Sequence, residues 1–527
     1  MIESLGRVTK ISGAQMTAEA DMPLSRLIRI GAMIKTRSGD QQVIGTIAAV
    51  EVETDGHSPR HLFVVDLLGE IVPTADEGGE FRRGVTLHPI PGAPVLAVSD
   101  ADVRLVYSRP LVSSLNVGTL FHDPTRPAFV LVDDLLAKNF AVLGTTGSGK
   151  SCAVALILSA ILADHPQAHI VVLDPHNEYS KAFGKLAEIV NVDNLRLPLW
   201  LLDFEEAVGV LVRGGTVQEQ EAQAIILKDA MLRARHRYAG ETLVASSITV
   251  DTPMPFGVSD LIRFIDQAMG QLDNPDTSAP YLRIRTRLES LRDDRRYEFM
   301  FSERLLARDT LGQIVGRLLR IPVDRKPITI IDLSGIPSEI ADVVVSMICR
   351  LTFDFSVWSE RGRMPPVLLV CEEAHRYVPA TENVGFGATA RALERIAREG
   401  RKYGVGLALI TQMPSELSAQ VLSQCGTVFA LRLGHYLDQR FMATALPDAA
   451  RGMLATLPSM RTQEAIAFGE GVRLPMHLRF DDLPAERQPR SESAKFSKAW
   501  RAETADLEFL NEGIRRWRQQ SRSPRAH

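Results

Sequence analysis

The segment GTTGSGKS, residues 144–151, has the residue types and spacing of a loop that binds phosphate. It follows the apolar run NFAVL and leads into the apolar run CAVALILSAILA, which predicts a strand, a glycine-rich turn and a helix in succession. Glycine lets backbone N–H groups approach phosphate closely, and a helix N-terminus adds positive charge. We expect Lys150 to reach the β- and γ-phosphates of ATP and the Ser151 hydroxyl to bind Mg²⁺. The predicted nucleotide-binding residues are Gly144, Thr145, Thr146, Gly147, Ser148, Gly149, Lys150, Ser151 and Cys152.

The segment PVLLVCEEAHRY, residues 366–377, supplies the carboxylates that such a site needs, one for the metal shell and one for the attacking water. Two registers are possible. Either Cys371 replaces the metal-side acid and Glu372 is catalytic, or Cys371 ends the strand, Glu372 supports Mg²⁺ and Glu373 polarises water. Mg²⁺ prefers oxygen ligands and a free cysteine behaves as a small buried hydrophobe, so we favour the second register. Taken alone, the two glutamates also fit a surface acid pair at the start of a helix.

The elements that must position these residues belong to three regions that differ in their residue patterns. From about residue 128, strand-like runs alternate with helical ones, which predicts a largely parallel sheet covered on both faces. Residues 215–320 have helical apolar spacing and many charges, which predicts a helical insertion. The first 110 residues contain short strand-like runs, including PVLAVSDADVRLVYS, separated by turn residues, which predicts a small β-barrel.

We therefore predict an α/β protein with a P-loop ATPase core, an N-terminal β-barrel and a helical insertion. The predicted boundaries are residues 1–110 for the barrel, 111–127 for a linker, 128–214 and 321–480 for the ATPase core, 215–320 for the insertion and 481–527 for a basic C-terminal tail.

The composition is that of an ordinary globular protein: 527 residues, 45% hydrophobic and 24% charged, with a net charge of −4. This net charge gives no indication of nucleic-acid binding, although a groove can be basic on a protein whose overall charge is negative. Four scattered cysteines without CxxC spacing argue against a disulfide framework or a zinc site and fit a reducing cytoplasm. The N-terminus lacks the apolar stretch of a signal peptide, and the longest apolar run, residues 152–163, is too short to span a bilayer. We expect a cytoplasmic protein without a membrane partner.

Six segments together resemble HerA-type ATPases, the hexameric DNA translocases of the FtsK/HerA group of P-loop NTPases. They are LGTTGSGKS, DPHNEYS, LPLWLLDF, EEAHRYVP, RIAREGRKYGVGLALITQMPSELS and VLSQCGTVFALRL. The resemblance covers most of residues 118–480, and the N-terminus resembles the HAS-barrel of that family. It implies a RecA-like core in which a sensor strand separates the P-loop strand from the acidic strand. It also supports Glu372 as the metal-side acid and Glu373 as the catalytic glutamate.

The resemblance assigns further roles. GLALITQ resembles the sensor strand, with Gln412 placed to sense the γ-phosphate or the attacking water, although capping of the next turn is an alternative. Arg401, and after it Arg398, is the candidate arginine finger that enters a neighbouring subunit's site. Most basic residues on a helix are simply solvated, which is the competing interpretation.

In DPHNEYS, Asp174 lies near the phosphates or merely starts an Asp-Pro turn, and Glu178 braces the site. Asn177 stands where glycine is common, and asparagine tolerates left-handed turns. His375 is expected to be a hydrogen-bonded histidine rather than a metal ligand.

The resemblance implies a homohexameric DNA translocase or helicase motor that encircles double-stranded DNA. The chain encodes no nuclease of its own, so a separate effector is expected: a NurA-like or other nuclease in DNA repair, or a nuclease or sirtuin-type protein in antiviral defence. The alternative is an ATPase scaffold ring that assembles and gates the effector, with translocation secondary. Candidate DNA contacts are the arginines of 233–237 and 283–287, which equally fit salt-bridged helix faces, and the loop PATENVGFGATA.

Overall fold

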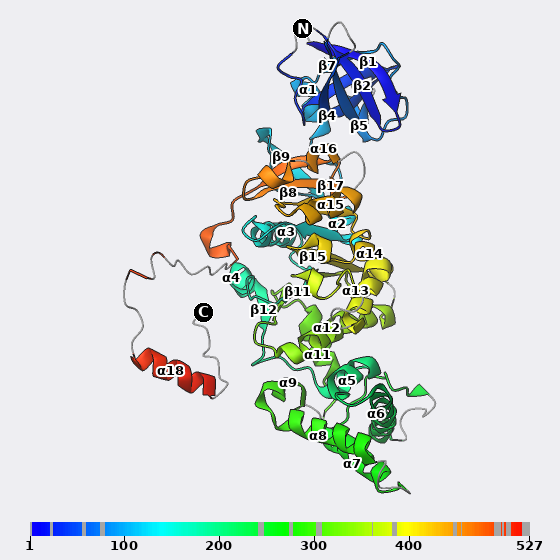
Figure 1. Ribbon diagram of the computed structural model, residues 1–527, viewed down its shortest axis with the longest axis vertical. Helices are drawn as coiled ribbons and strands as arrows, with labels where there is room; N and C mark the ends of the chain where they lie inside the picture. Colours follow the sequence, from blue (N-terminus) through cyan, green and yellow to red (C-terminus); the bar gives the residue numbers. More distant parts are fainter. Residues whose placement is uncertain are drawn as a thin grey trace.

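In the computed structural model the chain is elongated, with a barrel at one end, a large sheet in the middle and the helical insertion at the other end (Figure 1). The structure describes residues 3–21, 25–54, 59–73, 79–240, 247–272, 278–301, 308–360, 362–381, 387–445, 451–454, 456–489, 497, 500–501 and 507–518. None of the helices within these ranges is long and apolar enough to cross a membrane.

The N-terminal strands form a closed barrel. The order is β2-β1-β7-β3-β4-β5-β6, and β2 also pairs with β5, so the ring closes and β6 lies outside it. Closure leaves few exposed strand edges. Buried side chains such as Ile34, Val43 and Phe63 fill the interior. The strands are β1 (Ser4–Ser12), β2 (Gln15–Ala20), β3 (Met33–Ser38), β4 (Gln41–Thr54), β5 (Pro59–Val72), β6 (Glu80–Arg83) and β7 (Pro94–Ala97).

The run VRLVYS does not continue as a strand. Residues after β7 form helix α1 (Asp100–Val106), because Ser99 and Asp102 make a reciprocal capping box at its N-terminus. The local hydrogen bonds of this cap override the strand-like composition of the run.

An 11-stranded sheet forms the core, in the order β12-β13-β11-β14-β15-β10-β16-β17-β18-β8-β9. The strands from β12 to β16 run parallel, and those from β17 to β9 pair antiparallel. The sensor strand β15 lies between β10 and β14, as the resemblance implies. The strands are β8 (Ser114–Leu120), β9 (Asp123–Leu131), β10 (Phe140–Leu143), β11 (His169–Asp174), β12 (Ala187–Val190), β13 (Ile328–Asp332), β14 (Val367–Cys371), β15 (Val405–Thr411), β16 (Thr427–Ala430), β17 (Glu464–Gly469) and β18 (Met476–Phe480).

Helices cover both faces of the parallel strands, which explains why these strands are mostly apolar. Phe140 and Val142 of β10 belong to one buried cluster, together with helix α3 (Lys150–Asp164). Ala141 and Leu143 belong to the opposite cluster, with α12 (Ser338–Trp358) and α13 (Gly387–Glu399). The α/β fold class is thereby confirmed.

The linker predicted at residues 111–127 is wrong. Most of this stretch forms β8 and the start of β9, which extend the core sheet through the pairing of β8 with β18. Two prolines of this stretch, Pro124 and Pro127, lie on β9 at the edge of the sheet. There a missing N–H interrupts no ladder on the open side.

Residues 215–320 contain helices and no strand among those the structure describes. Helix α5 (Phe204–Leu211) leads into this region, and Thr216 opens α6 with a capping box to Glu219. The helices are α6 (Val217–Ala239), α7 (Val258–Met269), α8 (Ala279–Asp293), α9 (Glu298–Phe301) and α11 (Leu311–Leu319). In the C-terminal tail the structure describes a short 3-10 helix (Ala485–Arg487) and helix α18 (Leu507–Arg518), which lies beside the main body in Figure 1.

Candidate active site

The carboxyl ends of four adjacent parallel strands converge on one site. Strands β10, β15, β14 and β11 are followed by the phosphate loop, Gln412, the two glutamates and the turn of residues 174–180 respectively. In an open α/β sheet this edge is where ligands bind. The sheet order thus brings together the P-loop, Gln412 and both glutamates, although long stretches of sequence separate them.

The phosphate loop has the backbone that its sequence requires. Gly147 and Gly149 have φ angles of 75° and 101°, a region that residues with a side chain rarely adopt. The Ser148 hydroxyl donates a 2.7 Å hydrogen bond to the Thr145 carbonyl and tightens the turn. Helix α3 begins at Lys150, so its positive end faces the loop.

Lys150 is largely buried at this helix start. Its ammonium donates to the Thr145 carbonyl at 3.3 Å. Burial lowers the pKa of Lys150, whereas the charges of Glu372, Glu373 and Glu178 act to raise it. A desolvated cation facing several carboxylates is well placed to gain a phosphate group as a partner.

The acidic strand β14 ends at Cys371, which is fully buried, as the second register predicts. Glu372 follows directly, and the Tyr179 hydroxyl donates a short hydrogen bond to its Oε1. Glu373 adopts a left-handed conformation with φ of 53°, which turns its side chain to a different partner. Its Oε1 accepts a 2.6 Å hydrogen bond from Gln412 Nε2.

Gln412 joins the phosphate loop to Glu373. Its Oε1 accepts a short hydrogen bond from the Thr146 hydroxyl while its Nε2 donates to Glu373. The alternative role, capping the next turn, falls to Thr411, whose hydroxyl oxygen accepts the Met413 N–H at 3.1 Å. Nδ1 of His375 lies 2.9 Å from the same Thr411 hydroxyl, so this histidine is hydrogen-bonded as predicted.

The site carries more negative charge than the chain itself neutralises. Burial raises the pKa of Glu372 to about 8, and the charges of Glu178, Glu373 and Asp174 add to this against the lowering effect of the Tyr179 hydrogen bond. Glu373 Oε2 is buried without a hydrogen-bond partner in the described part of the chain, with His375 Nδ1 3.4 Å away. Crowded carboxylates and an orphaned oxygen beside a phosphate loop fit a divalent cation held by one or two carboxylates and phosphate oxygens.

Asp174 shapes a turn instead of facing the phosphates. Its carboxylate accepts the backbone N–H groups of His176, Glu178 and Tyr179 at 3.2, 3.1 and 3.0 Å. This is the Asp-Pro turn alternative. Asn177 has a φ of 54°, so the left-handed position foreseen there is present. The sequence interpretation assigned no role to Tyr179, although its place in the DPHNEYS segment, shortly after the strand-ending aspartate, is the signal that could have indicated one.

The candidate arginine fingers do not reach their own P-loop. Arg401 belongs to the short helix Gly400–Tyr403, which precedes β15, whereas the site lies after β15. A strand of this length spans roughly 20 Å at about 3.3 Å per residue. Arg401 is exposed and has no polar partner among the described residues, while Arg398 pairs with Glu394 at 3.4 Å.

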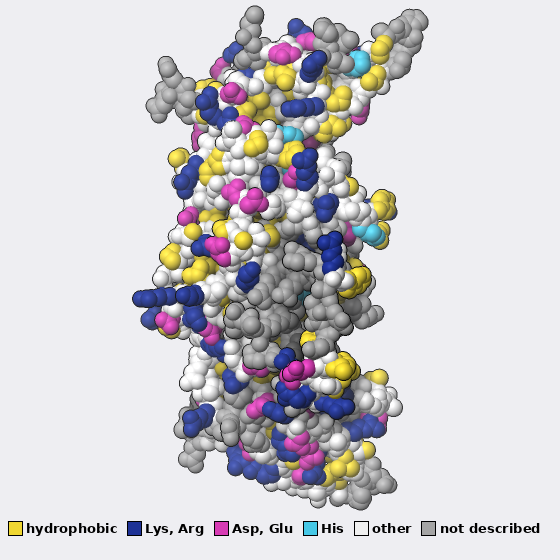
Figure 2. Space-filling view, turned by 90° about the vertical axis from the view of Figure 1, so that its left-hand side faces the viewer, with side chains coloured by type: hydrophobic (Ala, Val, Ile, Leu, Met, Phe, Trp, Pro, Cys, Tyr) yellow, Lys and Arg dark blue, Asp and Glu magenta, His cyan; other side chains and the backbone are white. Residues whose placement is uncertain are grey.

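The two arginine clusters are engaged within the chain. Arg233 pairs with Asp229, Arg237 with Asp260, Arg283 with Glu219, Arg285 with Asp266 and Glu289, and Arg287 with Glu339. Basic and acidic side chains are accordingly interspersed over the insertion, at the lower end of Figure 2. These contacts favour the salt-bridged alternative over a dedicated DNA surface. The centre of the loop PATENVGFGATA, residues 382–386, lies outside the described residues.

A turn that the sequence did not single out, residues 461–464, lies against the phosphate loop. The Gln463 N–H donates to the Ser148 carbonyl at 3.0 Å, and the Thr462 hydroxyl donates to the Gly147 carbonyl at 3.4 Å. The contact joins residues more than three hundred positions apart, so local sequence patterns carry no signal for it.

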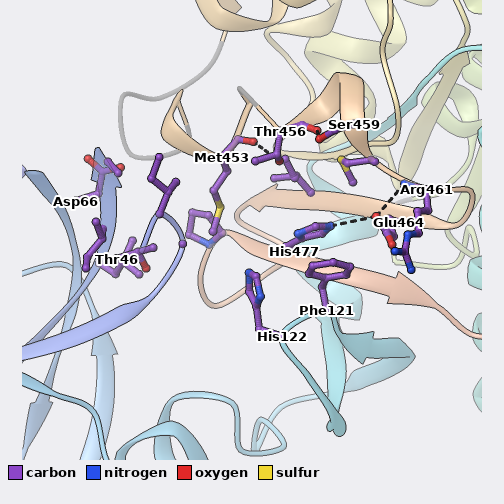
Figure 3. A pocket seen from close by; sticks show the side chains of 18 residues that line it. Thr46, Asp66, Phe121, His122, Met453, Thr456, Ser459, Arg461, Glu464 and His477 are labelled. Carbon is purple, nitrogen blue, oxygen red and sulfur yellow. Dashed lines mark hydrogen bonds and ion pairs between the residues drawn. The ribbon is translucent and has the colours of Figure 1, made fainter. Parts of the chain in front are cut away.

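The other side of this turn lines a cavity of about 320 Å³ between barrel and core (Figure 3). Arg461 and Glu464 form part of the wall, and the Phe121 and His477 rings stack with centroids 4.0 Å apart. Glu464 Oε2 accepts the Arg461 N–H at 2.9 Å and lies 3.9 Å from His477 Nε2. The turn therefore connects the barrel–core junction physically to the phosphate loop.

Comparison with known proteins identifies proteins that are similar to this chain in sequence or in fold. A family profile described as "Helicase HerA, central domain" matches residues 115–352. The DNA double-strand break repair helicase HerA of Pyrococcus furiosus is 26% identical over 463 residues, which cover 81% of this chain and 78% of that protein. HerA of Sulfurisphaera tokodaii is 23% identical and covers 89% and 92%. The solved structure of VirB4 from Thermoanaerobacter pseudethanolicus shares the fold with a TM-score of 0.50 at 17% identity, covering 71% of this chain and 98% of that one.

Proposed function

The chain belongs to the HerA-type P-loop ATPases, and from this premise we propose that it is a ring-forming motor that uses ATP hydrolysis to translocate double-stranded DNA. The observation that carries the proposal is the connected set Thr146, Gln412 and Glu373 beside Lys150 and Glu372. Phosphate binding, metal support and water activation each have a residue in this set.

The division of labour follows from the geometry. Backbone N–H groups of residues 144–151 and the Lys150 ammonium bind the phosphates. Ser151 and Glu372 would hold Mg²⁺, which when bound neutralises charge on the β- and γ-phosphate oxygens. Glu373 orients the attacking water and accepts its proton through the buried Oε2. Gln412 senses the γ-phosphate, because its amide oxygen accepts the Thr146 hydroxyl of the phosphate loop while its amide nitrogen donates to Glu373.

In the proposed ring, a neighbouring subunit supplies a positively charged side chain to each site. Arg401 lies about 20 Å from its own site by strand length and has no polar partner among the described residues. In the assembled ring it enters the neighbouring site and stabilises negative charge in the transition state. Six copies of the chain form this ring in our proposal.

The DNA assignment is supported by the relatives, which are named DNA double-strand break repair helicases. A translocase must ignore base sequence, so the ring contacts the phosphate backbone. The paired arginines of the insertion are poor candidates for this contact. A separate effector, a nuclease in DNA-end processing or defence, docks on the barrel and receives the DNA.

The test is ATP turnover by the full chain with and without duplex DNA, together with duplex binding measured by mobility shift at increasing salt. We expect DNA to stimulate turnover and affinity to fall steeply with salt, because phosphate contacts release counterions. Turnover that DNA leaves unchanged, with no salt-sensitive duplex binding, would overturn translocation and favour a scaffold ring. Lys150→Ala is the control that abolishes nucleotide-dependent activity.

A further inference from the structure

We propose that Tyr179 is a positioning residue for the magnesium site, and that the turn of residues 174–180 exists to deliver its hydroxyl to Glu372. The proposal rests on the Mg²⁺–ATP site of the proposed function and adds a residue and a purpose for the DPHNEYS segment. Its basis is the hydrogen bond from the Tyr179 hydroxyl to Glu372 Oε1.

The phenol ring of Tyr179 is fully buried. Tyr179 is 0% exposed, and its ring packs in the same buried cluster as Ile170, Val172 and Phe183. A tyrosine hydroxyl ordinarily has a pKa of about 10, so at neutral pH the group is protonated and acts as a donor. A neutral donor in a dry site gives a carboxylate a strong, directional hydrogen bond.

The turn is built to fix this donor. The Asp174 carboxylate accepts three backbone N–H groups, the last of them from Tyr179 itself at 3.0 Å. Asn177 occupies the left-handed position, and the Ser180 hydroxyl donates to its Oδ1 at 2.5 Å. These bonds fix the backbone of the turn, and the Tyr179 hydroxyl is the group of the segment that donates a hydrogen bond to Glu372.

The consequence is that the two glutamates have different partners. Tyr179 binds Glu372 and Gln412 binds Glu373. With Oε1 of Glu372 engaged, the orientation of the carboxylate is set, and its second oxygen has no hydrogen-bond partner among the described residues. Residues that orient a metal ligand in this way commonly change metal affinity about 10- to 100-fold when they are removed.

The test uses the full chain with Tyr179→Phe, which removes one oxygen and keeps the ring. Binding of a fluorescent ADP analogue is titrated at increasing Mg²⁺ and also in EDTA, and Mn²⁺ binding to the ADP complex is measured by electron paramagnetic resonance. We expect the Mg²⁺ and Mn²⁺ requirement to rise about 10- to 100-fold, with nucleotide affinity in EDTA unchanged. The matched control is Tyr377→Phe, a buried tyrosine after the same acidic strand whose hydroxyl has no hydrogen-bond partner among the described residues.

Two results would overturn the proposal. One is an unaltered metal requirement in Tyr179→Phe, and the other is an equal loss of nucleotide affinity with and without metal, which would mean a purely structural residue. These measurements need neither DNA nor hydrolysis, so failure of DNA stimulation leaves them interpretable. If nucleotide binding by the unaltered chain showed no metal dependence at all, the proposed Mg²⁺–ATP site and the role of Tyr179 would both fall.

Discussion

Gln412 Nε2 lies 2.6 Å from Glu373 Oε1, and the oxygen of the same amide accepts the hydroxyl of Thr146 in the phosphate loop. One side chain therefore holds the candidate base and the candidate phosphate cradle in a fixed relation. We expect a nucleotide that draws Thr146 toward its phosphates to change what Gln412 can bind, and through it the position of Glu373.

Replacing Gln412 with alanine should separate these two groups. We expect Gln412→Ala to bind nucleotide with nearly unchanged affinity and to lose about 100-fold in kcat, the size typical of one removed preorganised hydrogen-bond donor. Steady-state ATP turnover and equilibrium binding of a fluorescent analogue distinguish the two effects. Gln424→Ala, an exposed glutamine away from the site, is the control. A variant that turns over normally would place Gln412 outside the reaction.

The acidic pair offers a test of register. Glu373→Gln should retain Mg²⁺-dependent binding and lose at least about 100-fold in turnover, because it removes the general base. Glu372→Gln should weaken Mg²⁺-dependent binding as well. Both variants are compared by turnover and by nucleotide titration with and without Mg²⁺. Near-normal turnover of Glu373→Gln would remove it from the catalytic role.

Replacing Cys371 tests directly which of the two registers is correct. Because it is fully buried at the end of β14, Cys371→Ala should cost about 1 kcal/mol of stability and leave turnover per folded molecule almost unchanged. Thermal unfolding and turnover measured on the same preparation separate these effects. A large loss of turnover at normal folded content would revive the register in which Cys371 stands at the metal.

The trans role of Arg401 is tested by complementation. Arg401→Ala and Glu373→Gln should each be inactive as uniform rings. When the two are mixed and reassembled, some interfaces combine an intact Arg401 with an intact Glu373, so turnover should reappear. Action within one subunit predicts no recovery at any mixing ratio. Arg398→Ala, which removes a residue already paired with Glu394, should be close to the unaltered ring.

Sequence patterns identify the parts of this site that local chemistry dictates. The phosphate loop needs glycines at Gly147 and Gly149, and the second register places Cys371 inside the strand, so composition and spacing suffice. Sequence patterns do not indicate the role of Tyr179, because its partner Glu372 lies 193 residues away. Sequence patterns also do not indicate the contact of residues 461–464 with the phosphate loop, because the partners are far apart along the chain.

Two errors have separate physical origins. The linker predicted at 111–127 is an edge hairpin, where prolines are tolerated because one side of the strand has no partner. The strand-like run before it begins a helix because Ser99 and Asp102 cap it. In the first case the position of the strand in the sheet decides the outcome, and in the second case a local cap does.

A buried ion pair joins helix α5, which precedes the insertion, to helix α12 of the core. Glu206 of α5 is fully buried, and its carboxylate accepts hydrogen bonds from Arg350 Nη2 at 2.7 Å and from the Ser346 hydroxyl at 2.9 Å. Its Oε2 also accepts the Asp203 N–H at 3.1 Å and caps the helix. Removal of this charge would leave the Arg350 guanidinium, which is mostly buried, without its main partner.

Glu206→Gln should therefore destabilise the protein by about 3 kcal/mol, the usual cost of breaking a buried pair from one side. The measurement is chemical denaturation followed by fluorescence, with hydrogen exchange of α5 and α12 to locate the loss. Glu205→Gln is the matched control: Glu205 is exposed and pairs with Arg391 at the surface, so its replacement should cost less than about 1 kcal/mol. Equal effects of the two substitutions would show that the Glu206–Arg350 pair does not stabilise the packing of α5 against α12.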